Sequence, residues 1–472
     1  MSRKRGALFG LLLLYWFTRL HELEALAFFL DEAAHADWAR SIWQGHLFQA
    51  ASDGKLLNVF SIAVLWPFNA SVWAARASGV LTGTVGFACL LALCFRLFSA
   101  RAAILSGLLY IFLPLSFFYD RMALADPFSA AGAAITLWAV GRLFLLRRPS
   151  RQTLWWVLSG LSLNVAVFSK ISNLVFLCIP ATAVILLPLR EWQRGLKSAL
   201  SVYVAFAAMA GPLAVIVWRV GQSDLGLDLL AIKTVKAFFE PAATMIAVQK
   251  FMSFAPFPLW PVIVVGAVIS PWRGGRASWW IGCVTAISLG ALLMRSTSAT
   301  TESRYLVAYG PLIVSLAGSG LATLTQKWRP TWSVVGAVVM ISAGAQFMWL
   351  GWYRPQALPL PDQDRWQYIS GWPAGYGFRE IADDWIARNE PTQLATLDVG
   401  GRQRFEGYLL GGTGQVTAQR YKPGMPLTES LLIIDTPKDD QELAGLGLTL
   451  KEIARYPRPG GESALVVYRV TP

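Results

Sequence analysis

Long apolar runs, separated by short polar and basic segments, dominate the first 352 residues. A helix needs about 20 mostly apolar residues to cross a bilayer. We therefore predict about eleven membrane spans, near residues 7–20, 73–95, 102–118, 127–146, 153–168, 172–189, 198–217, 251–270, 278–294, 305–323 and 331–352. A shorter apolar piece at 56–68 is interpreted as re-entrant or juxtamembrane. The pattern predicts a polytopic α-helical membrane protein.

The basic residues indicate how the spans are oriented. The first run lacks a small-residue cleavage site before Asp31, so we expect it to remain as a span with a cytoplasmic N-terminus. The loops that then face the cytoplasm hold 16 Lys or Arg and one acid, Glu191, as the positive-inside rule requires. These basic residues are Arg3, Lys4, Arg5, Arg96, Arg101, Arg142, Arg147, Arg148, Arg151, Arg190, Arg194, Lys197, Arg273, Arg276, Lys327 and Arg329. The expected location is the inner (plasma) membrane.

Composition supports this class and excludes others. The chain has 472 residues, of which 55% are hydrophobic and 15% charged, and its mean hydropathy is +0.47, too apolar for a soluble multidomain protein. The formal net charge of +13 is accounted for by the cytoplasmic loops, so no nucleic-acid partner is implied. All four cysteines fall in predicted spans, where they are interpreted as apolar filling rather than disulfides or metal ligands.

The chain changes character after residue 352. Proline and glycine punctuate it, "FREIADDWIARNEP" has the period of an amphipathic helix, and "QLATLDV", "SLLIIDTP" and "SALVVYRV" have the composition of strands. We predict a transmembrane domain at 1–352, with outer loops at 21–72 and 118–127, and a small soluble α/β domain at 353–472. With an odd number of spans, this C-terminal domain is extracytoplasmic.

Ionisable residues gather on the predicted outer side of the membrane domain. Such groups are costly at a membrane boundary unless they face water, a partner or a polar cavity, so the gathering predicts one shared site. The first outer loop contributes Asp31, Glu32, His35, Asp37, Arg40, Asp53 and Lys55. The second contributes Asp120, Arg121 and Asp126, and later turns contribute Lys170, Glu302 and Arg304.

Several of these residues have simpler interpretations. Arg40, Arg76 and Lys250 are interpreted as interfacial anchors whose charges reach the lipid headgroups. Asp37 and Asp53 are either solvated or part of the site. His35, one helical turn after Asp31, is either a hydrogen-bonded structural histidine or a metal ligand.

The order and sidedness of three motifs resemble a known superfamily. "LDEAAHADWARSIWQG" follows the first span, "DRMALAD" forms the second outer loop, and "SRY" opens a late span. Together they resemble the GT-C glycosyltransferases related to protein O-mannosyltransferases and to the aminoarabinose transferase of lipid A. "YISGWPAGYGFREIADDW" is similar to a segment of bacterial members. The chain departs from the pattern with His35 in place of an aromatic residue, and with "GKLLN" in place of Lys-Pro-Pro-Leu around Lys55.

The resemblance implies an enzyme that moves a sugar from a polyprenyl-phosphate donor to an acceptor hydroxyl of a lipid, glycan or protein on the outer face of the membrane. Asp31 is then the candidate base, with Glu32 as a supporting or orienting carboxylate and Asp126 as a third catalytic candidate. Lys55, Arg121, Lys170 and Arg304 are candidates to hold the donor phosphate. His35, Asp120 and Glu302 are further site candidates. One base and one displacement would invert the anomeric centre.

Other interpretations remain open at this level. A secondary transporter or lipid flippase also places charges among spans, although these are expected at mid-membrane depth. A non-catalytic scaffold does not explain the gathering of charges. Asp31 and Glu32 can also simply stabilise the start of a helix. No cofactor is required, but a divalent cation shared by Asp31, Glu32, Asp126 and the donor phosphate is possible.

Overall fold

The computed structural model describes residues 3–48, 55–65, 71–145, 151–220, 249, 252, 259–273, 275–295, 302–327, 330–388, 390–409, 416–422, 430–437, 439–443, 445–461 and 463–471. The chain forms two compact units. The first contains residues 1–21, 48–58 and 79–349, and the second contains residues 22–47, 59–78 and 350–472. The predicted boundary at 353 lies close to the last of these divisions. The second unit also takes in parts of the predicted outer loop 21–72.

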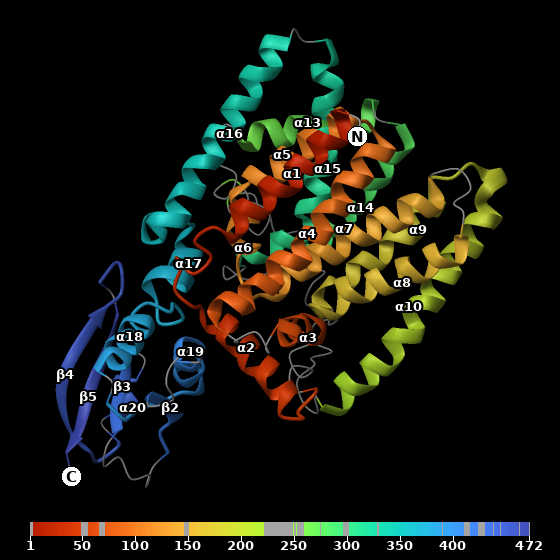
Figure 1. Ribbon diagram of the computed structural model, residues 1–472. Coiled ribbons are helices and arrows are strands. Elements are labelled where there is room, and N and C mark those ends of the chain that lie inside the picture. The colour runs from red at the N-terminus through yellow and green to blue at the C-terminus, as the bar shows by residue number, and fades with distance from the viewer. Residues whose placement is uncertain are drawn as a thin grey trace. The chain divides into compact units, whose positions relative to one another are not determined.

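The first unit is helical (Figure 1). It contains α1 (Arg3–Leu20), α5 (Ala100–Phe112), α6 (Pro114–Tyr119), α7 (Ala125–Phe144), α8 (Gln152–Phe168), η3 (Ile171–Leu177), α9 (Cys178–Ile185), η4 (Leu189–Glu191), α10 (Trp192–Val220), α13 (Leu259–Arg273), α14 (Gly275–Arg295), η6 (Ser303–Tyr309), α15 (Gly310–Leu324) and η7 (Thr325–Lys327). Three helices run from one unit into the other along the chain: α3 (Leu56–Leu65), α4 (Val72–Leu97) and α16 (Pro330–Tyr353).

Helical segments coincide with each predicted apolar run, apart from the stretch before Leu259 that lies outside the described residues. Within the described part of the chain, four segments are long and apolar enough to cross a membrane: Val72–Leu97, Ala125–Phe144, Leu189–Ile216 and Ser303–Leu324. The predicted count of eleven spans stays a prediction. The piece predicted as re-entrant or juxtamembrane contains the ten-residue helix α3, which is too short to cross.

Glycines allow the helices of the first unit to approach closely. A Cβ on Gly132 of α7 would lie 2.5 Å from the backbone nitrogen of Ala166 in α8. On Gly266 of α13, it would lie 2.4 Å from the carbonyl oxygen of Ala317 in α15. Small residues at such crossings replace side-chain packing with backbone contact, as is common between membrane helices.

The second unit contains a five-stranded sheet with the order β2-β1-β3-β5-β4 (Figure 1). Its strands are β1 (Thr392–Thr396), β2 (Val416–Arg420), β3 (Ser430–Thr436), β4 (Thr449–Pro457) and β5 (Ala464–Thr471). β1 pairs in parallel with β2 and β3, while β5 pairs antiparallel with β3 and β4. The helices are α2 (Leu30–Trp43), η8 (Pro355–Ala357), α17 (Asp362–Arg365), η9 (Trp366–Ser370), α18 (Phe378–Arg388), α19 (Val399–Leu409) and α20 (Asp440–Leu443).

Successive apolar side chains of β3 point to opposite faces of the sheet, so both faces are apolar. Leu431 and Ile433 pack in one cluster with Phe378 and Trp385 of α18 and Phe405 of α19. Leu432 and Ile434 point to the opposite face and form a second cluster. The predicted amphipathic helix and three predicted strands thus correspond to α18, β1, β3 and β5.

Candidate functional site

An ion pair between Lys170 and Asp126 is the centre of the candidate site in the first unit. Asp126 lies in the first turn of α7, and Lys170 lies just beyond Ser169, the C-cap of α8, so each charge suits the helix end beside it. The Lys170 Nζ lies 2.6 Å from the Asp126 Oδ1. Both side chains are largely buried, at 12% and 4% exposure. The close packing of Gly132 against Ala166 fixes these two helices against each other.

Residues of the "SRY" motif complete this cluster. The Lys170 Nζ lies 3.9 Å from the centre of the Tyr305 ring, a cation–π contact. The Arg304 guanidinium lies 5.9 Å from the same ring and forms an ion pair with Glu302. Tyr305 is therefore a member that the charge pattern alone did not identify, although the motif contained it.

The surroundings of Lys170 lower the pKa of its ammonium group. Burial lowers the pKa of Lys170 to about 8, Asp126 opposes this shift, and the positive charges of Arg304 and Lys55 add to it. Three predicted phosphate-binding cations, Lys55, Lys170 and Arg304, therefore influence one another electrostatically. A mainly cationic cluster beside an aromatic ring is suited to binding a phosphate group. The phosphate would accept from Lys170 either together with Asp126 or in its place.

Asp120 and Arg121 have other partners in the same unit. Asp120 accepts a hydrogen bond from the Tyr15 hydroxyl at 3.1 Å and lies 3.7 Å from the Arg19 Nε. Burial raises the pKa of Asp120 to about 6. The Arg121 guanidinium lies 4.8 Å from the centre of the Phe117 ring and donates to the carbonyl of His21 at 3.0 Å.

The contacts of Arg19 explain why this charged residue lies within the first apolar run. The Arg19 guanidinium donates to the carbonyls of Tyr110 and Ile111 at 3.2 and 2.9 Å, at the end of α5 where Pro114 ends the regular helix. The arginine thus satisfies carbonyls that the helix leaves without a partner. A cation inside an apolar run is itself a signal for a buried acceptor, and this signal was available in the sequence.

Asp31, Glu32 and His35 belong to the second unit, where all three lie on α2. Leu30 begins this helix, so Asp31 occupies its first turn rather than the N-cap, which is Phe29. The Asp31 side chain is partly exposed, whereas His35 is buried and its ring lies 5.4 Å from that of Trp38.

Glu32 forms a buried ion pair with Arg76. Its carboxylate accepts hydrogen bonds from the Arg76 Nε and Nη2 at 2.9 and 2.8 Å, and from the backbone N–H of Phe29 at 3.2 Å. Arg76 also donates to the carbonyls of Leu23, Leu26 and Ala27. Both side chains are almost completely buried. The arrangement fixes the start of α2, and with it the position of Asp31.

Two predicted anchors are wrong. Arg76 does not reach toward lipid headgroups, because Glu32 and three carbonyls hold it in the interior. Arg40 is held by the Glu406 carboxylate of α19 at 2.6 Å. Asp37 lies on α2, where it accepts hydrogen bonds from Arg402 and Gln403 at 3.0 and 2.8 Å. Lys250 and Asp53 lie outside the described residues.

Within the described residues, no three His, Cys, Asp or Glu side chains form a group that could hold a metal ion. Asp126 is in the first unit, whereas Asp31 and Glu32 are in the second. The predicted site shared by all of these residues, with or without a divalent cation, stays a prediction.

Comparisons with known proteins agree on the fold. Residues 59–218, about a third of the chain, match the family model for dolichyl-phosphate-mannose-protein mannosyltransferase. No curated protein matches the sequence. The crystal structure of ArnT from Cupriavidus metallidurans, bound to undecaprenyl phosphate, is similar with a TM-score of 0.60 and 16% identity, over 98% of this chain and 97% of that one.

Two further solved structures share this likeness. The oligosaccharyltransferase AglB from Archaeoglobus fulgidus, in complex with an inhibitory peptide and a dolichol-phosphate, matches with a TM-score of 0.52 and 12% identity, over 88% of this chain and 64% of that one. The arabinofuranosyltransferase AftD from Mycobacteria matches with a TM-score of 0.52 and 15% identity, over 100% of this chain and 40% of that one. The matches confirm the predicted resemblance, and the chain has the fold of the GT-C superfamily.

Proposed function

Because the chain has the GT-C fold, we propose that this protein is an integral-membrane glycosyltransferase. It would take a sugar from a polyprenyl-phosphate donor and transfer it to an acceptor hydroxyl. The observation that carries the proposal is the Lys170–Asp126–Tyr305 cluster, with Arg304 and Lys55 beside it. The similar structures of ArnT and AglB are described with undecaprenyl phosphate and dolichol-phosphate. Such a ligand has one charged phosphate and a long apolar chain, and it needs a cationic site at the edge of an apolar helical bundle.

The proposed reaction is a single displacement. The acceptor oxygen forms a bond to the anomeric carbon, the bond from that carbon to the phosphate oxygen breaks, and the anomeric configuration inverts. Lys170 and Arg304 stabilise the negative charge that develops on the departing polyprenyl phosphate. The Asp31 carboxylate takes the proton of the acceptor hydroxyl as its base. Asp126 positions Lys170 through their ion pair, and Glu32 orients α2 through Arg76.

The proposal places the reaction on the outer face of the plasma membrane. The support is the charge pattern, in which predicted cytoplasmic loops are rich in arginine while Asp31, Asp126, Lys170 and Arg304 belong to the other side. No nucleotide-binding motif is required, because the donor is carried by a lipid. The acceptor hydroxyl belongs to a lipid, a glycan or a protein of the cell envelope.

Comparative mass spectrometry of the cell envelope tests this function. Glycolipids and glycoproteins from cells with the gene, without it, and with a Lys170→Ala variant are compared. The proposal expects at least one species to lose a single hexose- or pentose-sized mass in both altered strains, with polyprenyl-phosphate sugar accumulating. An unchanged set of glycoconjugates, with altered movement of a solute or lipid across the membrane, would instead favour a transporter or flippase.

A further inference from the structure

A second polar site lies in the first unit, at the helix ends predicted to face the cytoplasm. A cavity of about 940 Å³ is formed where α4 and α7 end and where η4, α10 and α14 begin. Its volume is within the usual range for a small-molecule site. Its charged lining residues are Arg96, Arg190, Glu191, Arg194 and Arg276.

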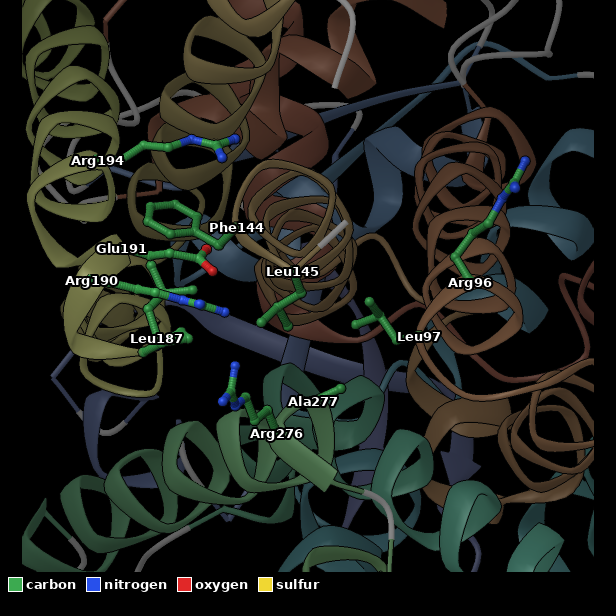
Figure 2. Close-up of a pocket in the computed structure, with 11 residues that line it drawn as sticks. Arg96, Leu97, Phe144, Leu145, Leu187, Arg190, Glu191, Arg194, Arg276 and Ala277 are labelled. Atoms are coloured by element: carbon green, nitrogen blue, oxygen red, sulfur yellow. The ribbon is translucent and has the colours of Figure 1, made fainter. Parts of the chain in front are cut away.

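Positive charge dominates this cavity. Among the described residues of the lining, four are arginines and one, Glu191, is acidic. Figure 2 shows Arg190 and Arg276 reaching toward the same space, with Glu191 beside Arg190 and Arg194 farther along the same side. Among the residues that the structure describes, the guanidinium groups of Arg190, Arg194 and Arg276 form no ion pair or hydrogen bond, and that of Arg96 lies over the Phe95 ring. One carboxylate cannot balance the charges of Arg190, Arg194 and Arg276, and a bound anion would reduce the remaining repulsion among them.

The positive-inside rule explains why arginines occur at these helix ends, but not why they meet around a cavity. Arginine is the side chain best suited to hold phosphate, because its planar fork donates two parallel hydrogen bonds. The cavity also has an apolar part, formed by Leu97, Phe144 and Leu145. A phosphate joined to an apolar group matches this mixed lining.

The surroundings of the cavity favour a lipid as the source of that phosphate. Leu189, which precedes Arg190, is 80% exposed, and Trp272 near the end of α13 is 79% exposed. Exposed tryptophan and leucine at helix ends are typical of the boundary between lipid and water. Basic pockets between membrane helices on the cytoplasmic side are suited to the headgroups of anionic lipids, which are abundant in that leaflet.

We propose that this cavity is a phosphate-binding site for the headgroup of an anionic phospholipid in the cytoplasmic leaflet, held by Arg190, Arg194 and Arg276. The site is separate from the Lys170 cluster in its residues and its predicted side, and it does not depend on the proposed transfer reaction. The bound lipid stabilises the protein by joining η4, α10 and α14, which carry Arg190, Arg194 and Arg276, through a shared counter-ion.

Lipid binding to the purified full-length protein tests this inference. Delipidated protein in detergent is titrated with phosphatidylglycerol, with phosphatidylcholine or with inorganic phosphate, and bound lipid and melting temperature are measured. The test variant is Arg190→Gln/Arg194→Gln/Arg276→Gln. The matched control, Lys4→Gln/Arg101→Gln/Lys197→Gln, removes the same charge from the same predicted face without changing the lining.

Phosphatidylglycerol is expected to bind saturably and raise the melting temperature of the wild type and the control, and the test variant is expected to bind it at least about tenfold more weakly. Saturable stabilisation of the wild type by inorganic phosphate, absent in the test variant, would assign the same phosphate chemistry to a soluble source. Equal binding of phosphatidylglycerol to the test variant and the control, or equal binding of phosphatidylcholine, would overturn the proposal. If the triple variant does not fold, Arg190→Gln/Arg276→Gln is measured in the same way.

Discussion

Lys170 combines burial, an ion pair and a ring contact, and this combination makes its proposed role sensitive to pH. Its folded-state pKa of about 8 is below the ordinary value of 10.5, so the ammonium form is lost as pH rises through about 8. We predict that the KM for the donor rises over this range, because the cation that holds the phosphate disappears. Lys170→Arg should flatten the rise, since arginine keeps its charge. Steady-state kinetics between pH 6.5 and 9 would check this, and the same rise in both proteins would remove Lys170 from the phosphate site.

The same site makes a prediction that is independent of pH. Removing one charge-assisted hydrogen bond costs about 1.5–3 kcal/mol, so Lys170→Ala should raise the donor KM by roughly tenfold to a hundredfold. Lys197→Ala, which removes an exposed lysine from the predicted cytoplasmic face, serves as the control and should leave the KM unchanged.

The Glu32–Arg76 pair predicts a stability effect in the second unit. Glu32→Gln leaves the buried guanidinium without its counter-ion, and breaking such a pair typically costs about 3–5 kcal/mol. Thermal unfolding of the purified variant should therefore show a clear loss. The comparison is Glu452→Gln, which breaks a solvent-exposed pair with Arg455 and should have almost no effect. Similar melting temperatures for the two variants would contradict a structural role for Glu32.

Close packing joins α7, which carries Asp126, to α8, which ends just before Lys170. A side chain at Gly132 would collide with the backbone of Ala166, which cannot move without shifting α8. We predict that Gly132→Leu separates α7 from α8 and lowers both thermal stability and donor use. Gly211→Leu in α10 is the matched control, because a Cβ there would meet no atom within 4 Å beyond the nearby backbone of its own helix. Equal effects of the two substitutions would show that the α7–α8 contact does not position the site.

Elements with a strong period could be predicted from the sequence. The amphipathic helix α18 and the strands β1, β3 and β5 follow directly from residue alternation, because each buries one or two continuous apolar faces. The edge strands β2 and β4 were not predicted. Few of their residues are buried, so their apolar pattern is weak, and their pairing depends on neighbours that are distant in sequence.

The candidate site was predictable only in part, because its contacts also join residues that are distant in sequence. The sequence identified Lys170, Asp126 and Arg304 as charges out of place in apolar surroundings, and this signal depends only on local composition. It could not identify their partners. Pairs such as Arg76 with Glu32, 44 residues apart, and Arg40 with Glu406, 366 residues apart, arise from tertiary folding. Arg40 and Arg76 were therefore misassigned as lipid anchors.

At the scale of the whole molecule, the charge pattern predicts opposite sides for two exposed lysines. Lys451 of β4 belongs to the predicted extracytoplasmic domain, and Lys197 of α10 belongs to a predicted cytoplasmic loop. In a variant without native cysteines, Lys451→Cys should react with an impermeant thiol reagent in intact cells. Lys197→Cys should react only after the membrane is opened. Labelling of both residues from outside, or of neither, would contradict the predicted topology.

We propose that this chain transfers a sugar from a polyprenyl phosphate, with Asp31 as the base. The most direct test is transfer by purified Asp31→Asn, compared with wild type, to the acceptor found in the envelope analysis. Asparagine has nearly the same shape and does not remove the Glu32 contact at the start of α2, so folding should be preserved. We expect a loss of about 10²-fold or more in kcat, the usual contribution of a positioned general base, with little change in the melting temperature. Near-normal turnover by the well-folded variant would contradict it.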